Sequence, residues 1–283
     1  MLRALLDEKV ARYNQPGFIE HDPISIPHQF SQPQDIEIMG FWAAVLAWGQ
    51  RPVILKKANE LVRLMDGAPF DFVRNHQDSD LKRFLNFKHR TFNATDTLYF
   101  LHFFRQYYQT HDTLEDAFLP DQIHCPRLEP GAMNLIGLQT GATDFATVEN
   151  HLIAFHNRFC ASIADTGEPD PFFPPRTRKH IATPARNSTC KRLLMFLRWM
   201  VRTDDAGVDF GLWTRISPAQ LVIPIDVHVE RVARHLGLLP ANTKTPPTWK
   251  TALELTDALR QFDPIDPVRY DFALFGMGVS GEV

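Results

Sequence analysis

The sequence predicts an almost entirely helical protein. Segment after segment carries apolar residues at helical spacing, and cap residues, glycines and prolines separate these segments. A chain of 283 residues can bury a full core. We expect two helical lobes, one formed by residues 34–203 and the other by residues 1–33 together with 204–283.

The first half of the chain predicts four helices. Residues 35–48 and 52–65 are joined by Gly49 to Pro52, which supplies a helix stop followed by a proline suited to a first helical turn. These two helices are expected to run antiparallel. Helices over 71–86 and 95–108 follow, and the aromatic face of the second is expected to lie in the core. Its cap candidates are Asn93, Thr95 and Asp96.

The middle of the chain contains fewer regular patterns. Residues 128–141 hold three glycines and a proline, which indicates a loop or a short helical turn. A helix is expected from about residue 144 to 164. Residues 166–184 hold five prolines and predict a long connection.

The last hundred residues predict four more helices. Residues 189–201 form a strongly apolar segment with Ser188 or Thr189 as N-cap, which places Lys191 in the first turn. Residues 223–225 are expected to be extended, and Asp226 then caps a helix over 227–236. The remaining helices span 248–262 and 266–277.

Composition excludes several classes of protein. The content of 44% hydrophobic and 22% charged residues is ordinary for a globular protein, and no apolar run reaches the roughly 18 residues of a membrane span. The charged N-terminus is unlike a signal peptide. Three cysteines without a C-x-x-C pair argue against a disulfide framework, a zinc ribbon and an iron–sulfur cluster. We therefore expect a cytoplasmic protein without cofactors.

Charge is distributed unevenly along the chain. The net charge is −3, yet residues 176–202 contain eight basic residues and no acidic one, so the rest carries −11. Such a segment indicates a face that binds an anion. The eight are Arg176, Arg178, Lys179, Arg186, Lys191, Arg192, Arg198 and Arg202.

Lys191 and Asp226 are the most economical catalytic pair. A lysine acts as a nucleophile only as the neutral amine, and apolar neighbours, nearby cations and the N-terminal end of a helix all favour that form. Asp226 would stabilise positive charge. The pattern alone leaves open that Lys191 is a solvated cation and Asp226 only a helix cap.

Two segments resemble a known superfamily. Residues 224–237, PIDVHVERVARHLG, are similar to the (V/I)D-(T/V)-H-(V/I)-x-R-(V/I)-(A/C)-x-(R/H)-L-G segment of the helix-hairpin-helix DNA glycosylases, which include endonuclease III and the 8-oxoguanine glycosylases. Residues 35–58 resemble the early helix pair of these enzymes. The whole chain also looks like an uncharacterised bacterial family related to them. The 35-residue interval from Lys191 to Asp226 is closest to the archaeal 8-oxoguanine glycosylase branch.

The resemblance implies a two-lobed all-α fold and base-excision chemistry on double-stranded DNA. Lys191 would attack the deoxyribose of a damaged nucleotide, such as an oxidised purine, and Asp226 would assist. We expect a monomer that acts at the bacterial nucleoid. Expected DNA contacts are Gln50, Arg51, Arg176, Arg178, Lys179, Arg186, Ser188 and Arg192, and expected base-pocket residues are Phe172, Phe173 and Trp199.

The sequence also departs from the superfamily. Its glycine-rich hairpin, L-P-G-(V/I)-G, corresponds here to residues 184–190, which contain no glycine. Arg186, Ser188 and the helix N-terminus would have to bind phosphate instead. The cluster-binding cysteines are missing as well, so no iron–sulfur cluster is expected.

Two other functions stay open. The protein could bind nucleic acid without catalysis, or Asp226, His228 and Glu230 could hold the metal of a hydrolase. Helical spacing argues against the metal site, because His228 would point away from the other two side chains.

Overall fold

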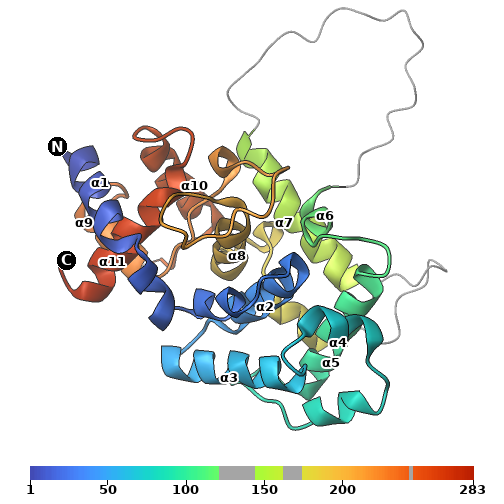
Figure 1. Cartoon of the computed structure of the whole chain (residues 1–283). Coiled ribbons are helices and arrows are strands. Elements are labelled where there is room, and N and C mark those ends of the chain that lie inside the picture. The colour runs from blue at the N-terminus through green and yellow to red at the C-terminus, as the bar shows by residue number, and fades with distance from the viewer. Residues whose placement is uncertain (121–143, 162–173, 242–244) are drawn as a thin grey trace, which may run out of the picture.

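The protein is helical, as predicted. The structure is a computed structural model that describes residues 1–120, 144–161, 174–241 and 245–283. Within these ranges the regular structure consists of α-helices and 3₁₀ helices, together with one isolated bridge between His89 and Phe92. Figure 1 shows how they pack. No helix in the described ranges is long and apolar enough to cross a membrane.

The α-helices in chain order are α1 (Leu2–Tyr13), α2 (Pro33–Leu46), α3 (Arg51–Leu64), α4 (Pro69–Asn75), α5 (Ala94–Tyr107), α6 (Glu115–Phe118), α7 (Asp144–Ala161), α8 (Lys191–Val201), α9 (Val227–His235), α10 (Trp249–Arg260) and α11 (Asp271–Ser280). The 3₁₀ helices are η1 (Pro16–His21), η2 (Pro23–Ser25), η3 (Pro27–Gln29), η4 (Asp80–Phe84), η5 (Pro175–His180), η6 (Pro184–Arg186), η7 (Pro218–Gln220) and η8 (Pro267–Tyr270).

Most predicted helices occur close to their expected ends. The segments at 35–48, 52–65, 95–108, 227–236 and 248–262 all form helices whose ends differ from these bounds by at most two residues. Strong hydrophobic periodicity and clear caps explain this agreement. Asn93, for example, forms a capping box with Asp96 at the start of α5.

Two predicted helices are divided instead. The segment 71–86 forms α4 and then η4, and the chain turns between them where the Asp80 carboxylate accepts the N–H of Gln77 at 2.9 Å. The segment 266–277 begins as η8 and becomes α11 only at Asp271. Helix α1 was not predicted from the sequence. Only Leu6, Lys9 and Val10 of its residues are buried, which leaves little hydrophobic periodicity to detect.

Some expectations concern residues outside the described ranges. The predicted loop at 128–141 and the first part of the connection at 166–184 belong to them. Helix α7 is described from Asp144 to Ala161. The division into two lobes stays a prediction.

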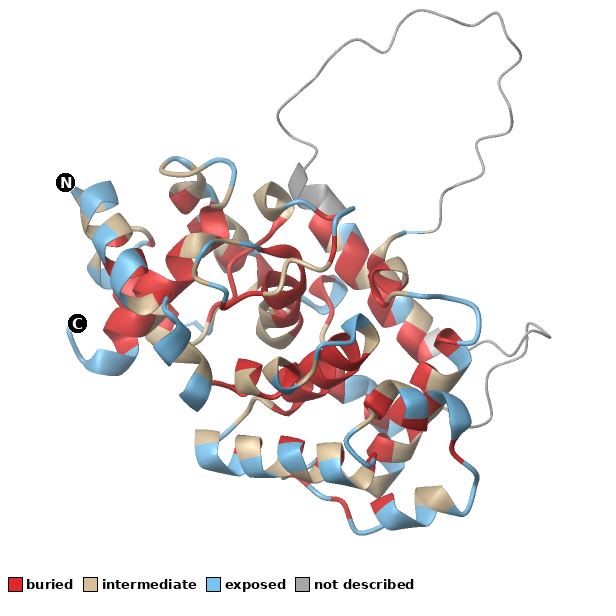
Figure 2. Ribbon diagram, viewed as in Figure 1, coloured by how far each residue is buried: buried red, intermediate tan, exposed pale blue. Residues whose placement is uncertain are grey.

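Helix α2 forms the centre of the molecule. It is buried without interruption from Asp35 to Leu46, and it contacts α3, α4 and α8 (Figures 1 and 2). The ring of Phe41 packs against Phe100 and Phe104 of α5. The aromatic face of α5 therefore lies in the core, as the sequence predicts.

Helix α11 connects both ends of the chain. It packs against α1 and against α9, the helix that Asp226 precedes (Figure 1). Helix α8 packs against α2. Lys191 at the start of α8 and Asp226 at the start of α9 thus come from helices with different neighbours.

Candidate functional site

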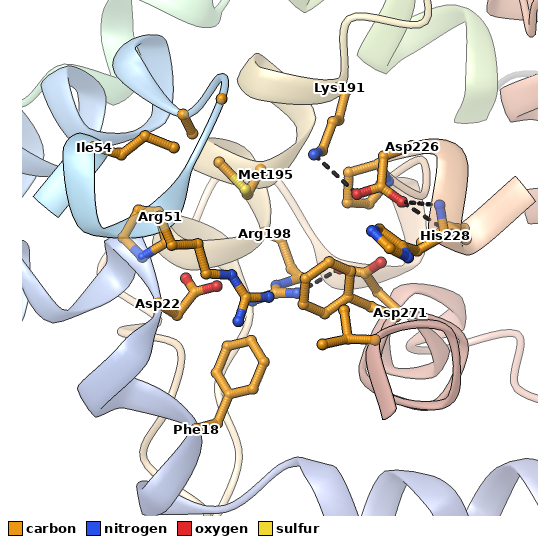
Figure 3. A pocket seen from close by; sticks show the side chains of 17 residues that line it. Phe18, Asp22, Arg51, Ile54, Lys191, Met195, Arg198, Asp226, His228 and Asp271 are labelled. Atoms are coloured by element: carbon orange, nitrogen blue, oxygen red, sulfur yellow. Dashed lines mark hydrogen bonds and ion pairs between the residues drawn. The ribbon is translucent and has the colours of Figure 1, made fainter. Parts of the chain in front are cut away.

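Lys191 and Asp226 lie in direct contact. The Nζ atom of Lys191 donates a hydrogen bond to Oδ2 of Asp226 at 3.0 Å, although 35 residues separate them (Figure 3). The Lys191 side chain is 33% exposed and that of Asp226 is 13% exposed. The amine is therefore held in place and can still be reached from solvent.

The first turn of α9 fixes the Asp226 carboxylate. Its Oδ1 accepts the N–H groups of His228 and Val229, both at 2.9 Å, which is an N-cap. Because Oδ1 satisfies the helix end, Oδ2 is directed at Lys191. Burial tends to raise the pKa of Asp226, but the Lys191 ammonium and the two N–H donors outweigh it and hold the pKa below its usual value.

A pocket opens beside this pair. Its volume is about 370 Å³, within the range of small-molecule sites. Four parts of the chain form its walls: the turns η1 and η2, the junction of α2 with α3, helix α8, and helices α9 and α11. On α8 the lining residues are Lys191, Met195 and Arg198, spaced one helical turn apart.

The wall opposite Lys191 carries a carboxylate and a guanidinium. Asp22 is 7% exposed, and its Oδ1 accepts the N–H of Ile24 at 3.1 Å. Burial raises the pKa of Asp22, and the Ile24 N–H and the cations Arg198 and Arg51 limit that rise. The Arg51 guanidinium lies 5.1 Å from the centre of the Phe275 ring.

The floor of the pocket is a buried ion pair. Arg198 donates hydrogen bonds to Asp271 and to Asp209, and all three residues are at most 5% exposed. Burial raises the pKa of Asp271 to about 6, and the neighbouring Asp226 adds to this effect, while Arg198 opposes it. Arg202 binds Asp209 as well, together with Asp204 and Asp266. Arg198 and Arg202 therefore neutralise carboxylates and are not part of a basic surface.

The turn before α8 contains two residues in a backbone conformation that glycine usually adopts, although it has no glycine. Asn187 and Cys190 both have left-handed backbone conformations, with φ of 57° and 52°. Cys190 is the residue before the helix, so the predicted cap at Ser188 or Thr189 is wrong, and no side chain caps α8. Ser188 instead accepts the N–H of Cys190 at 3.2 Å.

The expected DNA contacts differ in their exposure and in the partners they already have. Arg178, Lys179, Arg186 and Gln50 are exposed. Arg176 is exposed too, but it donates to the Thr91 carbonyl at 2.9 Å and lies 3.4 Å from Asp96. Arg51 lines the pocket rather than extending from the surface.

Arg192 does not form part of a binding surface. Its guanidinium donates to the carbonyls of Val45 and His180 and lies 4.9 Å from the centre of the Trp48 ring. Burial lowers its pKa to about 10. The prediction that Arg192 binds DNA is therefore wrong. Arg192 follows Lys191 directly in α8, and its side chain points toward α2 instead of the pocket.

Trp199 is not a base-pocket residue either. It is fully buried on the apolar face of α8 and does not line the pocket. The other two residues expected there, Phe172 and Phe173, lie outside the described residues.

The three side chains of the metal alternative point in different directions. Glu230 binds Arg234 at 2.7 Å, and Nδ1 of His228 lies 3.2 Å from the Gly278 carbonyl. In the described ranges no group of three His, Cys, Asp or Glu side chains could hold a metal ion.

The pocket residues that sequence reasoning did not assign to a site include two carboxylates, two aromatic side chains and one arginine. Asp22 and Phe18 come from short proline-initiated turns, which have no periodicity to detect. Asp271 and Phe275 lie in a uniformly apolar helix. Arg198 could have been found, because it lies seven positions after Lys191 and thus on the same helical face.

One comparison with known proteins identified a relationship. A protein-family model described as "Protein of unknown function (DUF2400)" matches residues 22–280. No curated protein and no solved structure matched. The family match spans most of the chain, including both Lys191 and Asp226, and the chain therefore belongs to the DUF2400 family.

Proposed function

We propose that the protein is a DNA glycosylase with lyase activity, in which Lys191 forms a Schiff base with deoxyribose. The observation that carries the proposal is the 3.0 Å contact between Lys191 Nζ and Asp226 Oδ2 at the wall of a pocket of about 370 Å³. The resemblance of residues 224–237 to the helix-hairpin-helix glycosylases supplies the reaction class.

Stability alone is a poor explanation for this pair. An ion pair with one partner a third exposed contributes at most about 1 kcal/mol. The N-cap of α9 needs only Oδ1 of Asp226. A carboxylate whose second oxygen is held beside an accessible amine is instead suited to catalysis, since preorganised charges act without reorganising during the reaction.

The reaction would proceed in two stages. A damaged nucleotide leaves the base stack, its base enters the pocket, and its C1′ comes to lie between Lys191 and Asp226. The C1′–N bond breaks, its electron pair leaves with the base, and the base gains a proton. Asp226 stabilises the positive charge that develops on the sugar.

Lys191 then forms the new bond at C1′. The amine must be neutral for this attack, and the proton that the Lys191 ammonium loses is the one that the departing base gains. Opening of the sugar ring moves a proton from nitrogen to the ring oxygen and gives the Schiff base. Loss of a C2′ proton expels the 3′ phosphate, which nicks the strand. Exposed cations of the segment 176–186 would bind the DNA phosphates.

Borohydride trapping tests the proposal. The wild-type protein is mixed with duplexes carrying 8-oxoguanine or an abasic site, and borohydride reduces any Schiff base to a stable adduct. The matched variants are Lys191→Gln and Lys250→Gln, the latter at a lysine whose side chain is 83% exposed. We expect an adduct with the wild type and with Lys250→Gln but not with Lys191→Gln.

The other outcomes distinguish the alternatives. DNA binding, measured by fluorescence anisotropy at fixed salt, is expected to be equal in all three proteins. An adduct with Lys191→Gln would assign the nucleophile to another residue. Binding without any wild-type adduct would favour a non-catalytic nucleic-acid-binding protein, and nicking that a chelator abolishes would favour a metal-dependent hydrolase.

A further inference from the structure

Two polar side chains of the pocket have hydrogen-bonding capacity that the fold does not use. Asp22 is nine-tenths buried, its carboxylate lines the pocket, and within the described ranges it forms no ion pair. Arg51 lines the same wall and likewise forms no ion pair there, resting instead on the ring of Phe275. Every other acidic side chain that lines the pocket has a cation as partner: Asp226 binds Lys191, and Asp271 binds Arg198.

These two groups lie on one side of the pocket. In Figure 3 the side chains of Asp22, Arg51 and Phe18 gather opposite Lys191 and Asp226. The electrostatic influence of Arg51 on Asp22 agrees with this proximity. A ligand that meets the Lys191–Asp226 pair at one end would therefore meet a hydrogen-bond acceptor and a hydrogen-bond donor at the other.

We propose that Asp22 and Arg51 read the edge of a guanine-derived base, with Asp22 accepting its N1–H and N2–H groups and Arg51 donating to its O6. This inference rests on the proposed function, since it concerns the base that the glycosylase would remove. It assigns a substrate class to the pocket.

Hydrogen-bond complementarity distinguishes guanine from the other bases. A carboxylate only accepts hydrogen bonds, and its two oxygens suit two adjacent N–H donors. Guanine presents two such donors beside a carbonyl. Adenine and cytosine place a bare ring nitrogen beside a single amino group, and thymine places its N–H between two carbonyls, so each would set an acceptor against Asp22.

Charge balance also argues against a cationic base. The pocket contains three carboxyl groups, Asp22, Asp226 and Asp271, and three cations, Lys191, Arg51 and Arg198. With no excess of negative charge, the pocket would gain little from a permanent positive charge on the ligand. A neutral base with a donor edge fits this arrangement better.

The experiment compares bases that differ in this edge alone. Single-turnover excision is measured with the full chain on duplexes carrying 8-oxoguanine, 8-oxohypoxanthine, which lacks the 2-amino group, or 8-oxoadenine. A ring-opened guanine (formamidopyrimidine) and uracil extend the set. We expect excision of the guanine-derived bases and at least a 10-fold slower reaction with 8-oxohypoxanthine.

Variants test the two residues directly. Asp22→Asn keeps an oxygen for the Ile24 N–H but replaces one acceptor by a donor, and we expect excision of the guanine-derived base to fall by about 10- to 100-fold. Asp22→Ser, whose hydroxyl can also accept the Ile24 N–H, and Arg51→Met serve as second variants. The control is Asp78→Asn, at an exposed position that does not line the pocket.

An abasic duplex separates the two proposals. Nicking at an abasic site requires Lys191 but no base in the pocket, so Asp22→Asn should slow excision of the guanine-derived base at least 10-fold more than it slows abasic nicking, whereas Asp78→Asn should leave both rates unchanged. Excision that is unchanged by Asp22→Asn, or directed at non-guanine bases, would overturn the base assignment while leaving the Schiff base intact. If wild-type protein cannot nick the abasic duplex, the proposed function itself fails.

Discussion

Gly278 in α11 lies so close to His228 in the first turn of α9 that no side chain fits between them. A Cβ atom on Gly278 would lie 2.8 Å from Cβ and 3.1 Å from the carbonyl oxygen of His228. Two hydrogen bonds reinforce this contact, since Arg231 and His228 both approach the Gly278 carbonyl. The contact fixes the helix whose N-cap is Asp226.

Replacing Gly278 by alanine should therefore impair the site from a distance. The clash involves the Cβ atom and the backbone of His228, neither of which can turn aside, so α9 must move and carry Asp226 with it. A displacement approaching 1 Å can cost about 100-fold in rate. We expect abasic-site nicking by Gly278→Ala to fall at least 10-fold, together with a loss of about 1–3 kcal/mol in the free energy of unfolding.

The matched control is Gly17→Ala, because a Cβ at Gly17 meets no atom within 4 Å. Nicking rates and urea unfolding of both variants provide the measurement. Wild-type nicking by a folded Gly278→Ala protein would show that the α9–α11 contact does not position Asp226.

Asp226→Asn separates the structural role of this residue from its chemical role. Asparagine retains an oxygen for the N–H groups of His228 and Val229, so the helix cap persists, and the lost ion pair with Lys191 should lower stability by at most about 1 kcal/mol. The negative charge beside Lys191 is lost. Because that charge would stabilise the sugar cation as the base departs, we expect base release to slow by about 100-fold or more.

Base release by Asp226→Asn is measured in single turnovers on the duplex that the wild type processes fastest, and thermal unfolding is recorded in parallel. Asp226→Ala serves as the comparison, since it removes the cap as well and should lower stability by about 1 kcal/mol. A wild-type rate of base release in Asp226→Asn would leave the residue with only its capping role.

Local patterns predicted those parts of the site that depend on a single segment. Asp226 follows an isoleucine–proline–isoleucine stretch and precedes an amphipathic helix, which is sufficient to identify an N-cap. Lys191 was placed in the first turn of α8 because the apolar pattern begins there. The contact between them could not be derived from pattern, since it depends on how α8 and α9 pack around α2 and α11. It was an expectation carried over from a resemblance.

Charge counting failed for a physical reason. Residues 176–202 contain eight cations, but Arg192, Arg198 and Arg202 point inward and bind carbonyl or carboxylate oxygens. Their partners Asp209, Asp266 and Asp271 come later in the chain, where the sequence gives no sign of the pairing. Asp22 was missed because a buried carboxylate in a short turn looks in sequence like any other cap.

The carboxyl group of Asp271 should make stability depend on pH in a distinctive direction. Its pKa is raised to about 6 by burial, against about 4 in an unfolded chain. Between these two values the folded protein keeps the proton while the unfolded chain loses it. The contribution of Asp271 to the free energy of unfolding must therefore fall as pH rises from about 4 to 6, by up to about 3 kcal/mol.

Asp271→Asn removes this titration. Relative to the wild type, the variant should gain stability as pH rises from 4 to 7, although its stability at any one pH also reflects the altered bond to Arg198. Asp226→Asn should show the opposite trend, because the pKa of Asp226 is lowered. The stabilisation that its carboxylate provides is present above the unfolded pKa and is lost as pH falls below it.

Urea unfolding of both variants and the wild type at pH 3, 4, 5, 6 and 7 measures these differences, with the Asp226 effect expected below pH 4 and the Asp271 effect between pH 4 and 6, and Asp78→Asn, at an exposed carboxylate, supplies a baseline. A difference between Asp271→Asn and the wild type that stays constant across this range would mean that Asp271 is ionised in the folded protein throughout. In that case the buried Arg198–Asp271 pair would be a permanent salt bridge, and the pocket floor would carry a fixed negative charge beside Asp226 even in mild acid.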